Sequence, residues 1–140
     1  MPLLKFHIDG GSRGNPGPAG YGVVVTDAAG SPVTMLHASL GVQTNNFAEY
    51  SGLLAALRYA LENGATEVAV FSDSELLVRQ MQGRYQVKSP SLRPLYEEAR
   101  QLVRQIPRFR IEHVYRESNR DADRLANQAM DKSAPPAGSR

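Results

Sequence analysis

The segment that most constrains this chain lies near its start, at residues 9–22, and has the sequence DGGSRGNPGPAGYG. It holds six glycines and two prolines, between an alternating segment at residues 5–8 and an apolar run at 23–25. Glycine allows close backbone approaches and proline fixes the backbone, so we interpret the segment as a shaped loop that begins with Asp9 at a strand end. Two interpretations are open: an ordinary turn between two strands, or a site where a large, flat ligand meets the backbone.

Composition is that of an ordinary globular protein. The 140 residues suffice for one domain with its own core, and 41% of them are apolar and 21% charged. The absence of cysteine excludes a disulfide framework, a thiolate nucleophile and a cysteine-ligated metal. No apolar run approaches the length of a membrane span, and residues 1–5 lack the apolar stretch of a signal peptide. We therefore expect a cytoplasmic protein with no membrane partner, and a monomer by default.

The hydrophobic periodicity predicts a mixed α/β fold. Alternation or short apolar runs predict strands, and apolar residues at helical spacing predict helices. The short connections between the first three strands favour an antiparallel meander, whereas the helix before the fourth strand makes that strand parallel to an earlier one. The predicted order is βββαβααβα, with strands at 5–9, 21–26, 33–40, 68–71 and 109–115 and helices at 46–62, 74–81, 91–106 and 119–130.

Four carboxylates stand where predicted elements begin or end: Asp9, Glu49, Asp73 and Asp123. Each also has a purely structural explanation. Asn46 and Glu49 have the spacing of a capping box, and Asp73 could cap the helix that follows it. Asp123 and its neighbour Asp121 could simply complement a helix dipole. Taken singly, none of these acids distinguishes a functional site from a helix cap.

Taken in series, the motifs resemble type 1 ribonuclease H. The resemblance covers residues 3–130 and is carried by DGGSRGNPGPAGYG, TNNFAEY, FSDS and SNRDADRLAN. It implies an RNase H-like fold, with a mixed five-stranded sheet flanked by helices. It also implies an endonuclease that hydrolyses the RNA strand of RNA/DNA hybrids and leaves 5′-phosphate and 3′-hydroxyl ends. The expected partner is therefore an RNA/DNA hybrid duplex.

The resemblance assigns catalysis and metal binding to Asp9, Glu49, Asp73 and Asp123, which would hold two divalent cations. The chemistry of these residues agrees, because clustered carboxylates repel one another and a cation relieves the repulsion. Oxygen ligands without cysteine suit Mg²⁺ or Mn²⁺ better than zinc. Two such ions about 4 Å apart can serve in-line phosphodiester hydrolysis, with no side-chain nucleophile.

The resemblance also implies the substrate contacts. Small residues and amides suit the wide, shallow minor groove of an RNA-containing duplex, where the 2′-hydroxyls are displayed. Thr44 matches a position that helps to hold a phosphate of the DNA strand. For Asn45 and Asn46, helix capping alone is the alternative explanation. The expected contacts to the RNA strand are Gly11, Ser12, Asn15, Asn45 and Asn46.

Two departures from the family pattern are visible. The loop before the last helix has no histidine, and we interpret His113, which alternates with apolar residues, as a packing residue of the fifth strand. A basic insertion between the second and third helices is also missing, which predicts weaker hybrid binding. A modest basic patch remains there, formed by Arg79, Arg84, Lys88 and Arg93.

The missing histidine leaves a second hypothesis open, a catalytically weak module of the same fold that binds hybrid or double-stranded RNA. All four acids are present, which favours the enzyme. Apolar spacing ends near Met130, so we expect a catalytic domain over residues 1–131. The tail at 132–140 is rich in Pro, Gly, Ser and Ala, and we expect it to be disordered.

Overall fold

The computed structural model describes residues 3–134, which form a mixed five-stranded sheet with helices on both faces. The strand order across the sheet is β3-β2-β1-β4-β5. The strands are β1 (Leu3–Ser12), β2 (Gly17–Asp27), β3 (Pro32–Gln43), β4 (Glu67–Ser72) and β5 (Arg108–His113). The helices are α1 (Asn45–Glu62), α2 (Glu75–Met81), α3 (Arg93–Arg104) and α4 (Arg120–Ser133), with a short 3₁₀ turn at Arg116–Ser118.

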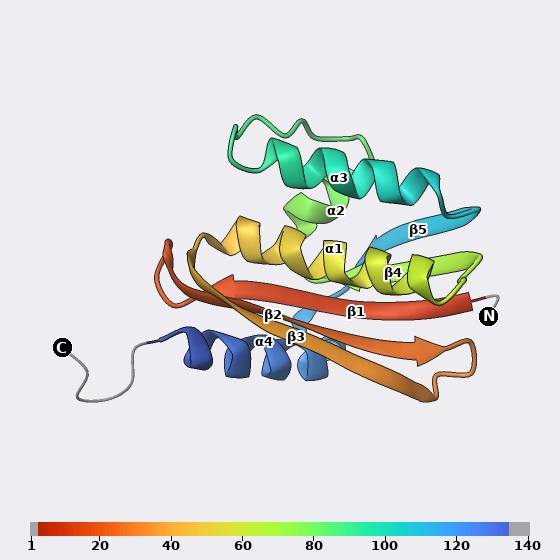
Figure 1. Ribbon diagram of the computed structural model, residues 1–140, viewed down its shortest axis with the longest axis horizontal. Coiled ribbons are helices and arrows are strands. Elements are labelled where there is room, and N and C mark those ends of the chain that lie inside the picture. The colour runs from red at the N-terminus through yellow and green to blue at the C-terminus, as the bar shows by residue number, and fades with distance from the viewer. Residues whose placement is uncertain (1–2, 135–140) are drawn as a thin grey trace.

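The pairing of the strands confirms the predicted topology. β1, β2 and β3 form an antiparallel meander, and β4 lies parallel to both β1 and β5. Helices α1, α2 and α3 cover one face of the sheet, and α4 covers the other (Figure 1). The carboxyl ends of β1, β4 and β5 therefore meet at one end of the sheet, where ligands of open α/β sheets commonly bind.

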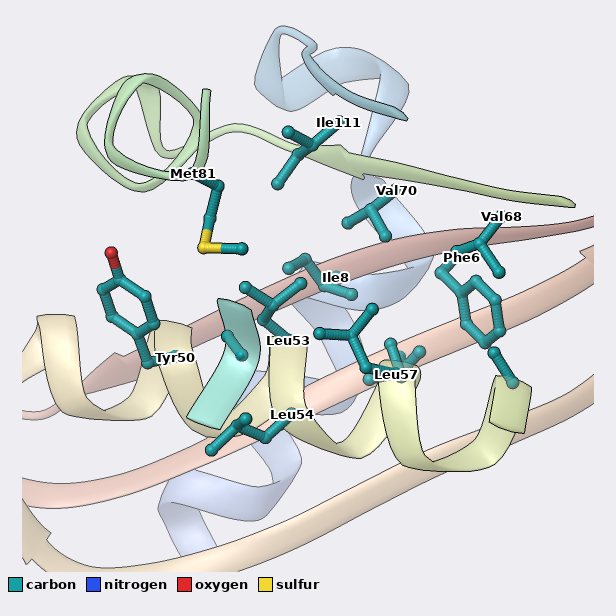
Figure 2. Close-up of a cluster of buried hydrophobic side chains, with 14 of the residues drawn as sticks. Phe6, Ile8, Tyr50, Leu53, Leu54, Leu57, Val68, Val70, Met81 and Ile111 are labelled. Carbon is teal, nitrogen blue, oxygen red and sulfur yellow. The ribbon is translucent and has the colours of Figure 1, made fainter. Parts of the chain in front are cut away.

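The main hydrophobic core fills the space between the sheet and the three helices above it. Phe6 and Ile8 of β1 and Val70 of β4 point from the sheet toward Leu53 and Leu57 of α1 (Figure 2). All five side chains are completely buried. Alternation along β1 and helical spacing along α1 thus supply the two apolar surfaces that pack together.

The glycine-rich segment differs from the predicted loop. Most of it is strand, because β1 continues to Ser12 and β2 begins at Gly17, so only residues 13–16 turn the chain. A Cβ at Gly10 would lie 2.5 Å from the Ala48 backbone of α1. A Cβ at Gly22 would lie 2.4 Å from the Cβ of Leu125 in α4. Glycine at these two positions therefore lets a helix approach each face of the sheet at backbone distance.

Element ends also differ from the predictions. α1 begins one residue early, and its N-cap is Thr44, whose Oγ1 accepts from the Phe47 amide at 3.2 Å. α4 continues through Lys132 and Ser133, which the sequence assigned to the tail. The Ser133 hydroxyl accepts from the Leu40 amide and donates to the Ala19 carbonyl, so it joins the helix to the sheet. Residues 135–140 of the expected tail lie outside the described residues.

None of the helices within residues 3–134 is both long and apolar enough to cross a membrane.

Candidate active site

Three of the predicted acids meet at the carboxyl ends of β1 and β4. Asp9 lies in β1, Asp73 follows β4 directly, and Glu49 lies in the first turns of α1. One carboxylate oxygen from each of the three residues lies within 4.8 Å of the others. The parallel pairing of β1 with β4 ends at Ile8 and Ser72, so Asp9 and Asp73 follow it on neighbouring strands, although β1 itself continues to Ser12. Gly10 lets α1 approach β1 closely enough for Glu49 to join them.

The cluster concentrates carboxyl groups in a largely buried place. Burial, followed by the charges of Asp73 and Asp123, raises the pKa of Asp9 from 3.8 to about 8. Burial and the neighbouring Asp9 and Asp73 raise the pKa of Glu49 well above its usual value. Burial also raises the pKa of Asp73, and the Arg116 guanidinium opposes that shift from 4.0 Å. The Oε2 atom of Glu49 is buried with no hydrogen-bond partner among the described residues. Such a set of oxygens is suited to a cation.

Asp123 reaches the same site from the opposite face of the sheet. It lies in the first turn of α4 and raises the pKa of Asp9 by its proximity, although it is not one of the three mutually close acids. Asn119 holds the start of α4 in place, since its Nδ2 donates to the Ile8 carbonyl at 2.8 Å. Asn119 is the N-cap residue of α4. Its side chain makes no capping hydrogen bond and ties α4 to β1 instead.

The acids line an open groove of about 590 Å³. All four predicted acids contribute to its walls, as do Gly11, Ser12, Asn45 and Asn46 of the expected substrate contacts. Asn15 and Thr44 do not line the groove and lie next to residues that do. The further lining residues are Gly10, Arg13, Ser74, His113, Val114, Tyr115, Arg116, Asn127 and Met130.

A polar network joins the glycine-rich hairpin to the start of α1. The Asn45 Oδ1 accepts from the Ser12 amide at 2.7 Å and from its hydroxyl at 3.0 Å. The Asn45 amide in turn donates to the Asn15 Oδ1 at 3.0 Å. These bonds occupy the side-chain oxygens of both asparagines, so their Nδ2 groups are the donors available to a ligand.

The structural explanations for two of the acids are wrong. Thr44 caps α1, so Asn46 and Glu49 do not form a capping box, and the Glu49 carboxylate is directed into the acid cluster. Ser74, not Asp73, caps α2, and its hydroxyl accepts from the Leu77 amide at 3.3 Å. Both acids are thus free of a capping role.

Comparisons with known proteins agree with this fold. A protein-family model described as reverse transcriptase-like matches residues 7–129. The bifunctional protein Rv2228c of Mycobacterium tuberculosis is 53% identical over 96% of this chain. Its N-terminal RNase H domain, solved as a fusion with maltose binding protein, superposes with a TM-score of 0.92 at 50% identity, covering 95% of this chain and 96% of that one. The chain belongs to the type 1 ribonuclease H family.

Further relatives of this ribonuclease H family member support the assignment. Ribonuclease HI of Halobacterium salinarum is 40% identical over 91% of this chain and 64% of its own length. LC11-RNase H1, solved in complex with an RNA/DNA hybrid, has a TM-score of 0.88 at 43% identity and covers 93% of this chain and 98% of that one. The chain spans only 37% of the length of the mycobacterial relative.

One groove residue contradicts its sequence interpretation. His113 was predicted to pack in the core, but it is exposed and lines the groove of this ribonuclease H family member. The apolar face of β5 is covered only as far as Ile111, whose carbonyl accepts from Gln82 at 3.0 Å. Beyond that point the strand passes the helices and enters the groove. Tyr115 is exposed beside it and also lines the groove. The sequence did not identify Tyr115 as a groove residue, because alternation alone does not reveal where the covering helices end.

The connection between α2 and α3, residues 82–92, carries no further helix in the described chain, consistent with the missing basic insertion. Two of the four cations predicted to form a patch there are paired within their own helices. Arg79 lies 3.4 Å from Glu75, and Arg93 lies 3.2 Å from Glu97. Arg84 and Lys88 are exposed. The basic patch is therefore smaller than its composition indicates.

Proposed function

We propose that this chain is a divalent-metal-dependent endoribonuclease that hydrolyses the RNA strand of RNA/DNA hybrids to 5′-phosphate and 3′-hydroxyl ends. The observation that carries the proposal is the cluster of Asp9, Glu49 and Asp73, whose oxygens approach within 4.8 Å at the floor of an open groove. The relative LC11-RNase H1, solved with a hybrid, supports the choice of substrate.

The residues of the cluster fit divalent cations. The unpartnered Glu49 Oε2 and the raised pKa values of Asp9 and Glu49 mark carboxylates that lack a compensating positive charge. Their hard oxygen atoms suit Mg²⁺ or Mn²⁺. We assign Asp9, Glu49, Asp73 and Asp123 as the ligands of two such ions. Bound there, the ions would lower the pKa of a water molecule and neutralise charge at the scissile phosphate.

The remaining groove residues would choose and orient the substrate. Gly11 offers backbone without a side chain, and the Nδ2 groups of Asn15 and Asn45 offer donors to ribose 2′-hydroxyls. The network from Ser12 through Asn45 to Asn15 fixes these donors relative to Asp9 on the same hairpin. By its resemblance to the family, Thr44, which caps α1, would help to hold a phosphate of the DNA strand. Substrate choice and metal binding would thus share one rigid support.

The test is cleavage of an RNA/DNA hybrid, labelled on its RNA strand, with Mg²⁺ or Mn²⁺. Asp9→Asn and Asp123→Asn each remove a proposed metal ligand and should lower kcat at least about a hundredfold, since loss of outer-shell partners alone costs up to that much. Asp121→Asn is the matched control on α4, because Asp121 is exposed and pairs with Arg124 outside the groove. It should retain the parent rate.

Equal cleavage by the parent and by Asp9→Asn would refute the proposal. Hybrid binding without any metal-dependent cleavage would favour the alternative of a binding module with the same fold.

A further inference from the structure

Tyr115 is an exposed aromatic side chain inside the groove. Its exposed fraction of 75% is the highest of any large hydrophobic side chain in residues 3–134. It lies just after β5, on the wall that also carries Arg116 and lies next to Asp73. The glycine-rich hairpin and Asn45 form another part of the lining. The proposed substrate contacts do not include Tyr115.

The position of Tyr115 is fixed by its surroundings although its ring is open. The amide of the preceding residue, Val114, donates to the Ser72 carbonyl at 2.9 Å. The Tyr115 carbonyl accepts from the Ser118 amide at 2.9 Å. The His113 ring packs against the tyrosine ring edge-to-face, with centroids 5.4 Å apart and an angle of 74° between the planes. The backbone is held on both sides and the His113 ring contacts the tyrosine ring, so part of the conformational freedom of Tyr115 is already lost before a ligand covers the ring.

The chemistry of a duplex limits what can cover this ring. Base faces inside a duplex are stacked on one another, so a side chain cannot stack on them without opening the helix. The wide, shallow minor groove of an RNA-containing duplex instead presents its sugars. A sugar ring offers apolar C–H groups to an aromatic face, and burial of both surfaces is favourable.

We propose that the Tyr115 ring packs against a sugar of the hybrid next to the cleaved position, and that this contact supplies affinity independent of sequence and of charge. The inference rests on the proposed function in that it takes a hybrid duplex as the ligand of the groove. It assigns Tyr115 to substrate binding, with His113 as the residue that positions the ring.

A binding measurement on a variant impaired in cleavage tests this contact separately from catalysis. In an Asp9→Asn background with Mg²⁺, the Kd for a short fluorescein-labelled RNA/DNA hybrid is measured by anisotropy at several salt concentrations. Tyr115→Ala should raise Kd about tenfold, equivalent to about 1.4 kcal/mol. Tyr115→Phe should stay within about twofold of the parent, because the ring and not the hydroxyl makes the contact. The slope of log Kd against log salt should be unchanged, since no phosphate contact is lost.

Steady-state kinetics in the active parent give a second readout. Tyr115→Ala should raise KM by a similar factor and leave kcat nearly unchanged, as expected for uniform binding. Met35→Ala is the matched control, since Met35 is 58% exposed and does not line the groove.

Three results would overturn the inference: Tyr115→Ala binding as tightly as the parent, Tyr115→Phe losing as much affinity as Tyr115→Ala, or a shallower salt slope in Tyr115→Ala. If no variant cleaves but Tyr115→Ala still weakens hybrid binding, the nuclease proposal fails and this inference stands. If the parent cleaves and Tyr115→Ala changes neither Kd nor KM, this inference fails and the nuclease proposal stands.

Discussion

Asp9 shows at the scale of one residue how the proposed metal site opposes stability. Its carboxylate accepts a hydrogen bond from the Gly10 amide at 3.0 Å, but burial and the neighbouring acids still raise its pKa to about 8. A charged Asp9 is therefore unfavourable in the folded chain unless a cation is bound. This is the expected cost of assembling several carboxylates for metal binding.

The pKa of Asp9 predicts a pH dependence of stability in the metal-free protein. Between about pH 4 and pH 8 the folded chain keeps a proton on Asp9 that the unfolded chain releases, so Tm should fall as pH rises through this window. Asp9→Asn should weaken that dependence and have the higher Tm at pH 8. Thermal unfolding followed by circular dichroism in EDTA measures both.

Addition of Mg²⁺ should raise the Tm of the parent more than that of Asp9→Asn, because a ligand stabilises the folded state more the more tightly it binds. Identical Tm profiles for the two proteins in EDTA would contradict the assignment of the raised pKa to Asp9.

Individual residues were predictable where strand pairing fixed their position, although Asp9 lies inside β1 and not, as predicted, at its end. Asp9 and Asp73 were placed by the parallel strands that carry them, and their proximity follows from the topology. His113 was misassigned because the alternating pattern of β5 continues beyond the point where Ile111 ends the covered face. The role of the Asn119 side chain was not predictable, because an asparagine before a helix looks the same whether its side chain caps the helix or crosses to another strand.

At the scale of elements, the glycines of the hairpin determine how closely the helices pack on the sheet. The glycine-rich segment is predominantly a hairpin in which Gly10 lies under α1 and Gly20 and Gly22 lie under α4, so its composition reflects helix packing as much as ligand access. Sequence alone could not separate these two roles, because both require a missing Cβ. The three-dimensional packing separates them, since Gly22 faces a helix, Gly11 lines the groove and Gly10 does both.

Two glycine variants test this division of roles. Gly22→Ala would place a Cβ 2.7 Å from the Ala122 carbonyl oxygen and force α4 away from the sheet. It should lower the free energy of unfolding by about 1–3 kcal/mol, the usual cost of overpacking. Gly11→Ala would meet only the flexible end of Met130, at 3.2 Å, and should cost less than about 1 kcal/mol. Urea denaturation measures both values.

Gly11→Ala and Gly22→Ala also distinguish a glycine needed for helix packing from one needed for substrate contact. Gly11→Ala should weaken hybrid binding although it remains folded, because the added methyl group occupies the groove wall. If Gly22→Ala were as stable as Gly11→Ala, α4 would not depend on that close approach.

On the scale of the whole molecule, the acids lie together at one end of the sheet, near the carboxyl ends of its parallel strands. The topology that brings them together was predictable from the order of the elements. Strands β1, β4 and β5 point their carboxyl ends the same way, and α1 and α4 approach that end from opposite faces (Figure 1). The extent of the basic surface was not predictable, since composition does not show which cations pair with acids. Arg79 and Arg93 have carboxylate partners one helical turn away.

The salt dependence of hybrid binding should therefore depend on Arg84 and Lys88. Each phosphate neutralised by a side chain contributes about 0.9 to the magnitude of the slope of log K against log salt. If both residues touch phosphates, Arg84→Ala combined with Lys88→Ala should reduce that magnitude by about 1.8. Arg104→Ala is the control, because Arg104 ends α3 near the start of β5, at the opposite end of the sheet from the groove. An unchanged slope in the double variant would mean that Arg84 and Lys88 are solvated charges, and that the hairpin and the groove wall alone hold the hybrid.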